Sequence, residues 1–185
     1  MVRIDFLMYL NDSLRGNRPS VLSLIGMSGV GKTAIGQRLS LALGYHFIDT
    51  DKVIAEVLKT DLPGFIQQYG DKALLEKEEE VVAGLIFPLN TVVATGGSVV
   101  YSEKAMENLR QQSYVIYLQD SFENITRRTS LKNRGIISPY SSRFEDIYLE
   151  RIPLYEQYAH HIFEMPFPFN GGKAVSDLID QLNKK

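Results

Sequence analysis

The sequence contains no cysteine among its 185 residues, carries little net charge and has no long apolar run. Without cysteine there is no disulfide framework, no thiolate zinc site and no cysteine nucleophile. The formal net charge of −2 argues against a large nucleic-acid footprint and against a polybasic membrane-binding surface. The apolar patch at residues 4–10 is interrupted by Asp5 and is too short for a signal peptide or a spanning helix. We therefore expect a cytoplasmic monomer with no nucleic-acid or membrane partner.

The hydrophobic content of 44% is enough for a sizeable core, and the length fits one compact domain. We interpret residues 1–18 as an N-terminal extension with a short amphipathic helix over 3–15, and residues 19–185 as a single domain. Short apolar runs alternate with segments of helical spacing, which predicts a five-stranded parallel α/β sheet with helices on both faces. The runs lie at 20–25, 45–48, 91–94, 114–118 and 162–165.

The segments between these strands have apolar residues at helical spacing. We expect Pro153 to kink or restart the helix that contains it. The ligands of parallel sheets bind beyond the carboxyl ends of the strands, so the residues that follow each strand are the candidates for a site. The expected helices cover 34–43, 52–59, 63–69, 71–87, 103–112, 122–131, 143–159 and 174–182.

A glycine-rich turn follows the first strand and matches the phosphate-binding pattern G-x-x-x-x-G-K-[ST] in full. Glycines let several backbone N–H groups point at one anion, and the following helix adds the positive end of its dipole. Lys32 supplies a point charge for the β- and γ-phosphates, and the hydroxyl of Thr33 is a hard oxygen ligand for Mg²⁺. We expect this loop to bind ATP and Mg²⁺; its residues are Gly26, Met27, Ser28, Gly29, Val30, Gly31, Lys32 and Thr33.

Two aspartates follow the second strand. Asp49 can hold Mg²⁺ through water, and Asp51 can accept the proton of an acceptor hydroxyl or orient that hydroxyl. Asp51 can also be the N-cap of the helix expected at 52–59. The sequence has no guanine-reading Asn-Lys-x-Asp segment, as a GTPase would need, and no apolar strand that ends in paired acids, as in motor and transporter ATPases. A small-molecule kinase is the class that remains.

At these positions the chain resembles the shikimate kinase family. The matching segments occur in the family's order and at about its spacing, and they cover roughly residues 20–165. The Asp-Thr-Asp and Arg-x-Pro-Leu-Tyr motifs are specific to this family among the P-loop kinases. The segments are Gly26 to Thr33, Phe47-Ile48-Asp49-Thr50-Asp51, Gly70-Asp71 with Glu78, Gly96-Gly97, Arg127-Arg128, and Arg151-Ile152-Pro153-Leu154-Tyr155.

The resemblance implies a nucleoside-monophosphate-kinase-like fold with a substrate-binding region at about 51–87 and a lid at about 130–143. It implies transfer of the γ-phosphate of ATP to the 3-hydroxyl of shikimate. Asp51 would then hold the acceptor hydroxyl, and Arg151 would bind the substrate carboxylate. Gly96 and Gly97 would let the backbone approach the substrate ring.

The same resemblance assigns three residues on the nucleotide side. Asp49 would lie near Mg²⁺, and Arg134 would be the lid arginine that reaches the transferred phosphate. Arg128 would lie beside the adenine, although a surface charge on a helix is an equally good interpretation of that residue.

The chain departs from the family pattern on the acceptor side. Where the family has an arginine that binds the substrate carboxylate, this chain has Leu75. Lys72 precedes it by three residues on the same helix face, so its charge can partly replace the arginine but not the bidentate fork. Ser98 stands in place of the third glycine of a Gly-Gly-Gly segment, and the lid arginine is followed by Gly135-Ile136-Ile137 rather than by proline and leucines.

Three hypotheses remain open from the sequence. The first is a kinase for shikimate, which Asp51 and Arg151 favour. The second is a kinase for another hydroxy acid or polyol such as gluconate, which Leu75 and Ser98 favour. The third is a nucleotide-binding regulator without acceptor chemistry, and the acceptor-side residues argue against it.

Overall fold

The computed structural model describes residues 19–128 and 136–184. Its strands and helices alternate, as the sequence predicts. In chain order the elements are β1 (Val21–Ile25), α2 (Lys32–Leu43), β2 (His46–Asp49), α3 (Thr50–Leu58), α4 (Leu62–Gly84), β3 (Thr91–Ala94), the 3₁₀ turn η1 (Val99–Tyr101), α5 (Glu103–Gln112), β4 (Tyr114–Gln119), α6 (Phe122–Arg128), α7 (Phe144–Tyr158), β5 (His161–Glu164) and α8 (Gly171–Asn183).

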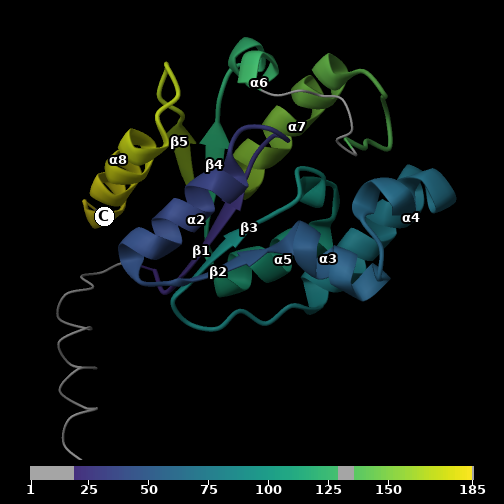
Figure 1. Ribbon diagram of the computed structural model, residues 1–185, viewed down its shortest axis with the longest axis horizontal. Coiled ribbons are helices and arrows are strands. Elements are labelled where there is room, and N and C mark those ends of the chain that lie inside the picture. Colours follow the sequence, from purple (N-terminus) through teal and green to yellow (C-terminus); the bar gives the residue numbers. More distant parts are fainter. Residues whose placement is uncertain (1–18, 129–135, 185) are drawn as a thin grey trace, which may run out of the picture.

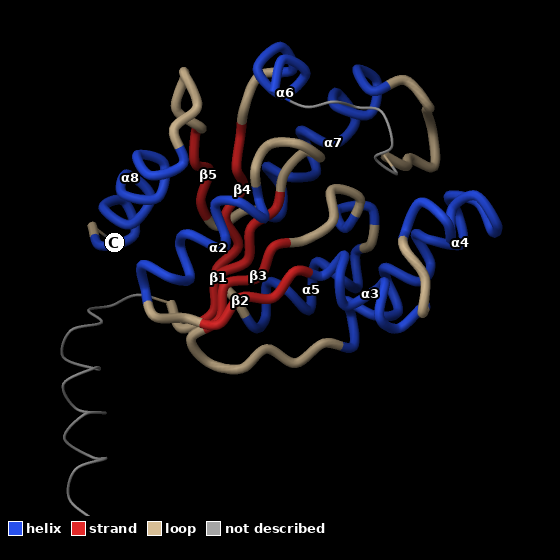
Figure 2. The backbone as a smooth tube through the Cα atoms, viewed as in Figure 1, coloured by secondary structure: helices blue, strands red, loops and turns tan. Residues whose placement is uncertain are grey.

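The five strands form one parallel sheet in the order β2-β3-β1-β4-β5. In Figure 1, α2 and α8 pack together in front of this sheet while α5 and α7 lie behind it, which gives three layers. All residues of β1 and β3 are buried, because both faces of these central strands are covered by helices. Figure 2 shows the strands gathered at the centre, with α3 and α4 extending to one side of them. The predicted fold class is confirmed.

The helix that follows β2 begins two residues earlier than the sequence predicts. Asp49, rather than Asp51, is the N-cap of α3, and its carboxylate accepts a hydrogen bond of 3.1 Å from the backbone N–H of Asp51. The interpretation of Asp51 as the N-cap is therefore wrong. As a consequence, the carboxylate of Asp51 is not used for capping.

The two helices predicted at 63–69 and 71–87 are the two halves of α4. Gly70 separates them with a backbone φ of 82°, a conformation that glycine adopts without steric cost. The helix ends at Gly84, three residues before the predicted end. The break matters for the site because it sets the direction of the second half, which carries Glu78.

Pro153 lies inside α7, which continues from Phe144 to Tyr158 without a restart. Proline cannot donate a hydrogen bond to the carbonyl of Leu149, one turn earlier. Both residues are exposed, so water can solvate the carbonyl that loses its partner. The proline therefore leaves the buried face of the helix, with Arg151 and Tyr155, in regular geometry.

The helix expected at 3–15 and residues 130–135 of the expected lid lie outside the described residues. Within the part that the structure describes, every helix is too short or too polar to cross a membrane. The division into an extension and a single domain at residue 19 stays a prediction.

Gly36 on α2 tests how tightly this helix packs on the sheet. A Cβ at this position would lie 2.6 Å from the ring of Phe47 and 3.3 Å from Leu24. We expect Gly36→Ala to lower the free energy of unfolding by about 1–3 kcal/mol in urea titrations, because the helix would have to move away from β2. Gly84→Ala is the matched control, since a Cβ there meets no atom within 4 Å, and it should be neutral or stabilising by up to about 1 kcal/mol. Equal losses in the two variants would contradict this packing argument.

Candidate active site

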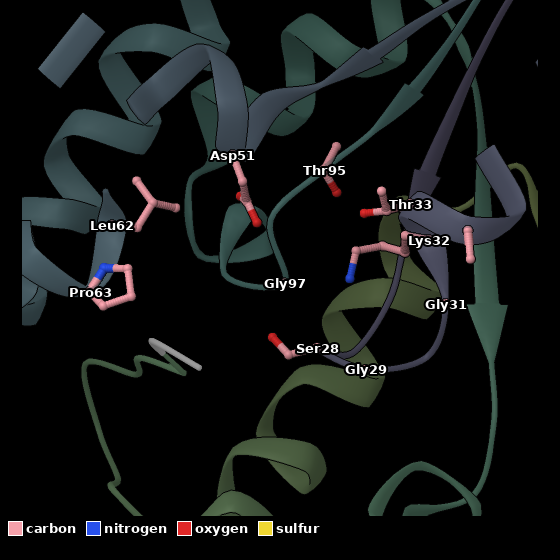
Figure 3. Close-up of a pocket in the computed structure, with 11 residues that line it drawn as sticks. Ser28, Gly29, Gly31, Lys32, Thr33, Asp51, Leu62, Pro63, Thr95 and Gly97 are labelled. Carbon is pink, nitrogen blue, oxygen red and sulfur yellow. The ribbon is translucent and has the colours of Figure 1, made fainter. Parts of the chain in front are cut away.

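The carboxyl ends of β1, β2 and β3 meet at one edge of the sheet, and the loops that follow them line a single cavity. Figure 3 shows Lys32 and Thr33 on one side of it, Asp51 on another, and Leu62 with Pro63 at the far wall. The cavity has a volume of about 420 Å³. The cavity therefore lies at the edge of the sheet where the sequence predicts a site.

The phosphate loop has the backbone conformation that its glycines allow. Gly26 and Gly31 have φ values of 141° and 112°, which residues with a Cβ rarely adopt. Lys32 is buried beneath the loop, and its ammonium donates hydrogen bonds of 2.7 Å to the carbonyl of Gly26 and 3.0 Å to that of Met27. Burial lowers the pKa of Lys32 to about 8, although the carboxylate of Asp51 opposes this shift. A bound phosphate would favour the charged form of the lysine.

Thr33 and Asp49 form the pair of oxygens expected for Mg²⁺. The hydroxyl of Thr33 donates a hydrogen bond of 2.9 Å to the Asp49 carboxylate, so the two predicted metal ligands lie side by side. One hydroxyl and one carboxylate, completed by water and phosphate oxygens, are the kind of ligand set that Mg²⁺ uses in phosphoryl-transfer sites. Among the described residues, no group of three or more His, Asp or Glu gathers at metal-binding distance. The structure fits Mg²⁺ held jointly with phosphates.

Asp51 projects from the first turn of α3 into the cavity, opposite Lys32 (Figure 3). The surrounding protein raises the pKa of its carboxyl by desolvation, and the ammonium of Lys32 counteracts that effect. A raised pKa brings a carboxylate closer to the range in which it accepts a proton efficiently near neutral pH. Its position and its pKa both suit an acid–base group beside the phosphate loop.

A second, smaller compartment of about 50 Å³ adjoins the first and shares Ser28, Asp51, Leu62 and Gly97 with it. Its remaining wall contains two buried charged side chains, Glu78 from α4 and Arg151 from α7, with Ile54, Leu74, Gly96 and Ser98.

Arg151 is 1% exposed, and its Nη2 donates to the carbonyl of Ile137. Its Nε and Nη1 atoms are buried without a hydrogen-bond partner. Unpaired guanidinium donors in a buried site are costly, so a ligand anion that accepts from them is favoured. The guanidinium also packs on the ring of Tyr101, with 5.0 Å between its carbon and the ring centroid.

Gly96 and Gly97 lie beside the buried charged side chains of Glu78 and Arg151. A Cβ at Gly96 would lie 2.3 Å from Glu78 Oε1, and one at Gly97 would lie 2.8 Å from Arg151 Nη1. With Glu78, Asp51 and Arg151 in these positions neither glycine has room for a Cβ, so the predicted close approach of the backbone is consistent with the geometry. The hydroxyl of Tyr155 holds this segment by donating a hydrogen bond of 2.7 Å to the carbonyl of Gly97.

Arg128 lies near the phosphate loop at the other end of the site. It forms an ion pair with Asp120, and its guanidinium carbon is 5.0 Å from the ring centroid of Phe169. That ring is in turn beside the loop, because a Cβ at Gly31 would be 3.7 Å from it. Arg128 is thus engaged in defined contacts rather than pointing freely into solvent. Its place beside a bound adenine stays a prediction.

One predicted acceptor-side residue, Lys72, lies away from both compartments. The side chain of Lys72 is 91% exposed and its ammonium lies 3.9 Å from Glu76, so it does not line either compartment. Leu75 does not line them either, whereas its neighbour Leu74 does. Arg134 lies outside the described residues. The roles assigned to Lys72 and Arg134 therefore stay predictions.

The sequence motifs did not identify three side chains as part of the site, namely Glu78, Ser98 and Tyr155. Glu78 and Tyr155 were matched positions of family motifs, but nothing in their local sequence shows that they are buried beside the cavity. Ser98 was noted as a departure from the family, and its hydroxyl donates a hydrogen bond to Glu78 Oε2. Only the folded arrangement of α4, α7 and the loop after β3 reveals these contacts.

The buried Glu78 makes stability depend on pH. Burial raises its pKa from 4.5 to about 7. The folded state therefore holds a proton that the unfolded state has lost between these values. The stability that this group contributes is fully present below pH 4.5 and is lost as the pH rises through 7. The decline amounts to about 3 kcal/mol.

We expect Glu78→Gln to remove this decline, as measured by denaturant unfolding at intervals from pH 5 to 8 and compared with the unchanged protein. Glu79→Gln is the matched control because the pKa of Glu79 is lowered by its hydrogen bond to Lys104. That variant should keep the decline. The same pH dependence in Glu78→Gln and the unchanged protein would show that Glu78 does not titrate in this range.

A family model described as shikimate kinase matches residues 28–167. A shikimate kinase of Paracidovorax citrulli is 34% identical over 175 residues, which is 91% of this chain and 92% of the relative. A shikimate kinase of Nitrosomonas europaea is 32% identical over 173 residues, 92% of this chain and 80% of the relative.

Solved structures give the same result. The structure of shikimate kinase from Acinetobacter baumannii in complex with shikimate superposes with a TM-score of 0.79 at 28% identity, covering 94% of this chain and 98% of that one. A gluconokinase from Sinorhizobium meliloti superposes with a TM-score of 0.54 at 18% identity, a likeness that shows the fold alone. The chain belongs to the shikimate kinase family and is an ATP-dependent small-molecule kinase that uses Mg²⁺.

Proposed function

We propose that the acceptor is shikimate and that the reaction transfers the γ-phosphoryl group of ATP to its 3-hydroxyl. The observation that carries this proposal is the buried guanidinium of Arg151, whose Nε and Nη1 have no partner, in the same compartment as Asp51. This pair suits a small acid that offers a carboxylate to the arginine and a hydroxyl to the aspartate. The relative from Acinetobacter baumannii, which was solved with shikimate, supports the choice.

On the donor side, the residues Gly26 to Thr33 would hold the phosphates with their backbone N–H groups. The ammonium of Lys32, which already lies at the centre of the loop, would contact the β- and γ-phosphates. Thr33 and Asp49 would hold Mg²⁺, which when bound neutralises phosphate charge during transfer. Arg128 would border the adenine, and Arg134 would reach the transferred group from the lid.

On the acceptor side, Asp51 would accept the proton of the attacking hydroxyl and hold its oxygen in line with the γ-phosphate. Gly96 and Gly97 would let the backbone lie against the acceptor, since neither position has space for a Cβ. Holding both reactants at such close range supplies much of the rate enhancement in phosphoryl transfer, where there is little covalent chemistry for the protein to perform. Lys72 would have to turn away from Glu76 to assist.

A kinase for another hydroxy acid, such as gluconate, is the second candidate. It is favoured by Leu75, which adds no positive charge where the family has an arginine. It is also favoured by Ser98, whose side chain lines the compartment where the family has a glycine. We further propose that the chain is a cytoplasmic monomer without a nucleic-acid partner, which its small net charge supports.

The test is an acceptor screen with ATP and Mg²⁺, in which ADP formation is followed with shikimate, quinate, gluconate and the dehydro and amino relatives of shikimate. Saturable turnover with shikimate in the usual micromolar-to-millimolar KM range supports the proposal. Saturation by gluconate alone would establish the second candidate. Slow ATP hydrolysis that no acceptor changes would reject both in favour of a nucleotide-binding regulator.

We expect Arg151→Lys to raise the KM for the acceptor by about 10- to 100-fold, because a charge-assisted bidentate contact becomes a point contact. The KM for ATP should stay within a factor of about two, since Arg151 lines the inner compartment and not the phosphate loop. The matched control is Arg127→Lys, because Arg127 is 67% exposed and pairs with Glu123 on the surface. An unchanged acceptor KM in Arg151→Lys, with a normal melting temperature, would remove Arg151 from the acceptor site.

A further inference from the structure

The carboxyl group of Glu78 is buried in the acceptor compartment and forms no ion pair with any of the described residues. Its residue is 4% exposed, and no lysine or arginine among the described residues forms an ion pair with it within 4 Å. The residue one turn earlier on α4 is Leu75, which brings no charge. A buried carboxyl in this situation needs hydrogen bonds, and the Ser98 hydroxyl donates one to its Oε2.

The second oxygen of Glu78 lies near the carboxylate of Asp51. Glu78 Oε1 and Asp51 Oδ1 both lie within 2.7 Å of the point that a Cβ on Gly96 would occupy, so they are at most twice that distance apart. Both groups line the inner compartment. An acceptor whose reactive hydroxyl is held by Asp51 would therefore bring a neighbouring hydroxyl close to Glu78.

Ser98 has a local structural role available that it does not use. It is the N-cap residue of η1, yet its side chain makes no capping hydrogen bond. Four residues later, Ser102 combines both roles. Its hydroxyl accepts from the N–H of Ala105 at the start of α5 and donates to Glu79, the residue beside Glu78. The contrast indicates that the hydroxyl of Ser98 serves the site rather than the turn.

We propose that Ser98 is a positioning residue, which holds Glu78 so that its free oxygen accepts a hydrogen bond from an acceptor hydroxyl that is not phosphorylated. The inference rests on the proposed function and adds the feature by which the acceptor is selected. Asp51 and Glu78 together would recognise two hydroxyls, and Arg151 the carboxylate. The compartment would thereby reject an acid that has the reactive hydroxyl but lacks the second one.

The ionisation of Glu78 offers an independent measurement of this contact. The charged groups that face Glu78 are Asp51 from α3, Arg151 from α7 and Lys32 from α2, and the uncharged hydroxyl of Ser98 donates a hydrogen bond to it. The hydrogen bond from Ser98 lowers the pKa of Glu78 and so opposes the upward shift caused by burial. Removing the hydroxyl should therefore raise this pKa further.

The experiment uses the full chain with ATP and Mg²⁺. It compares shikimate with two analogues, each of which lacks one of the two hydroxyls that do not receive the phosphoryl group. For Ser98→Ala we expect the KM for shikimate to rise about 2- to 12-fold, with kcat changed less than about twofold. For the analogue that lacks the contacted hydroxyl, the KM should be the same in both proteins. The midpoint of the pH dependence of 1/KM should move to higher pH.

Three further variants separate positioning from folding. Ser98→Thr keeps a hydroxyl and should restore the KM and the pH midpoint, whereas Ser98→Gly should behave as Ser98→Ala does. Ser102→Ala removes the neighbouring serine–glutamate contact and a helix cap, so it should lower the melting temperature while leaving every KM unchanged.

The two proposals fail in different ways. If the unchanged protein phosphorylates no hydroxy acid, the proposed function is wrong. If it phosphorylates shikimate but Ser98→Ala has the same KM and pH profile, or raises the KM equally for every analogue, Ser98 does not position Glu78 for the acceptor.

Discussion

Four ionisable side chains converge on the site, three of them buried and the fourth, Asp51, exposed in the cavity, and the rest of the site depends on their mutual compensation. Lys32 and Arg151 supply positive charge, and Asp51 and Glu78 supply negative charge or hydrogen-bonding carboxyls. Each would be costly to bury alone, since an uncompensated charge in a protein interior either shifts its pKa or is excluded. The raised pKa of Glu78 and the lowered pKa of Lys32 show that the compensation is incomplete in the protein alone.

This incomplete compensation explains why the site is specific. The unpaired donors of Arg151, and the carboxyl oxygen of Glu78 that does not accept from Ser98, would gain hydrogen-bond partners from a ligand with matching groups. Burying polar groups without partners lowers the free energy of unfolding, and the same unpaired groups are available to bind a ligand. A ligand that supplies the partners recovers that free energy on binding. The donor side, in contrast, consists mainly of backbone N–H groups, which carry no net charge.

The donor side could be predicted from sequence because its constraints are local. A loop that must turn tightly around an anion needs glycine at set spacings, and the residues after a parallel strand must lie at the sheet edge. The strand order was not predictable in this way, since it depends on contacts between distant segments. The N-cap of α3 was misassigned by two residues because Asp49 and Asp51 are equally good caps, and only the register of β2 decides between them.

The acceptor side was harder to predict because it is assembled from four separate elements. Helical spacing placed Lys72 and Leu75 on one face, but the rotation of α4 after the break at Gly70 puts Leu74 and Glu78 on the wall of the compartment. Ser98 appeared to be a simple loss of a glycine. The structure shows that its hydroxyl donates a hydrogen bond to the buried carboxyl of Glu78. Side chains that compensate one another across elements leave no pattern in any one stretch of sequence.

The regular course of α7 past Pro153 has a consequence for the spacing between the two halves of the site. Arg151 and Tyr155 lie one turn apart on the buried face, and an α-helix rises about 1.5 Å per residue, so the two are separated by about 6 Å along the axis. The hydroxyl of Tyr155 contacts both the carbonyl of Gly97 and the sulfur of Met27 in the phosphate loop. One turn of α7 thus sets the spacing between Arg151, which would bind the acceptor, and the phosphate loop, which would bind ATP.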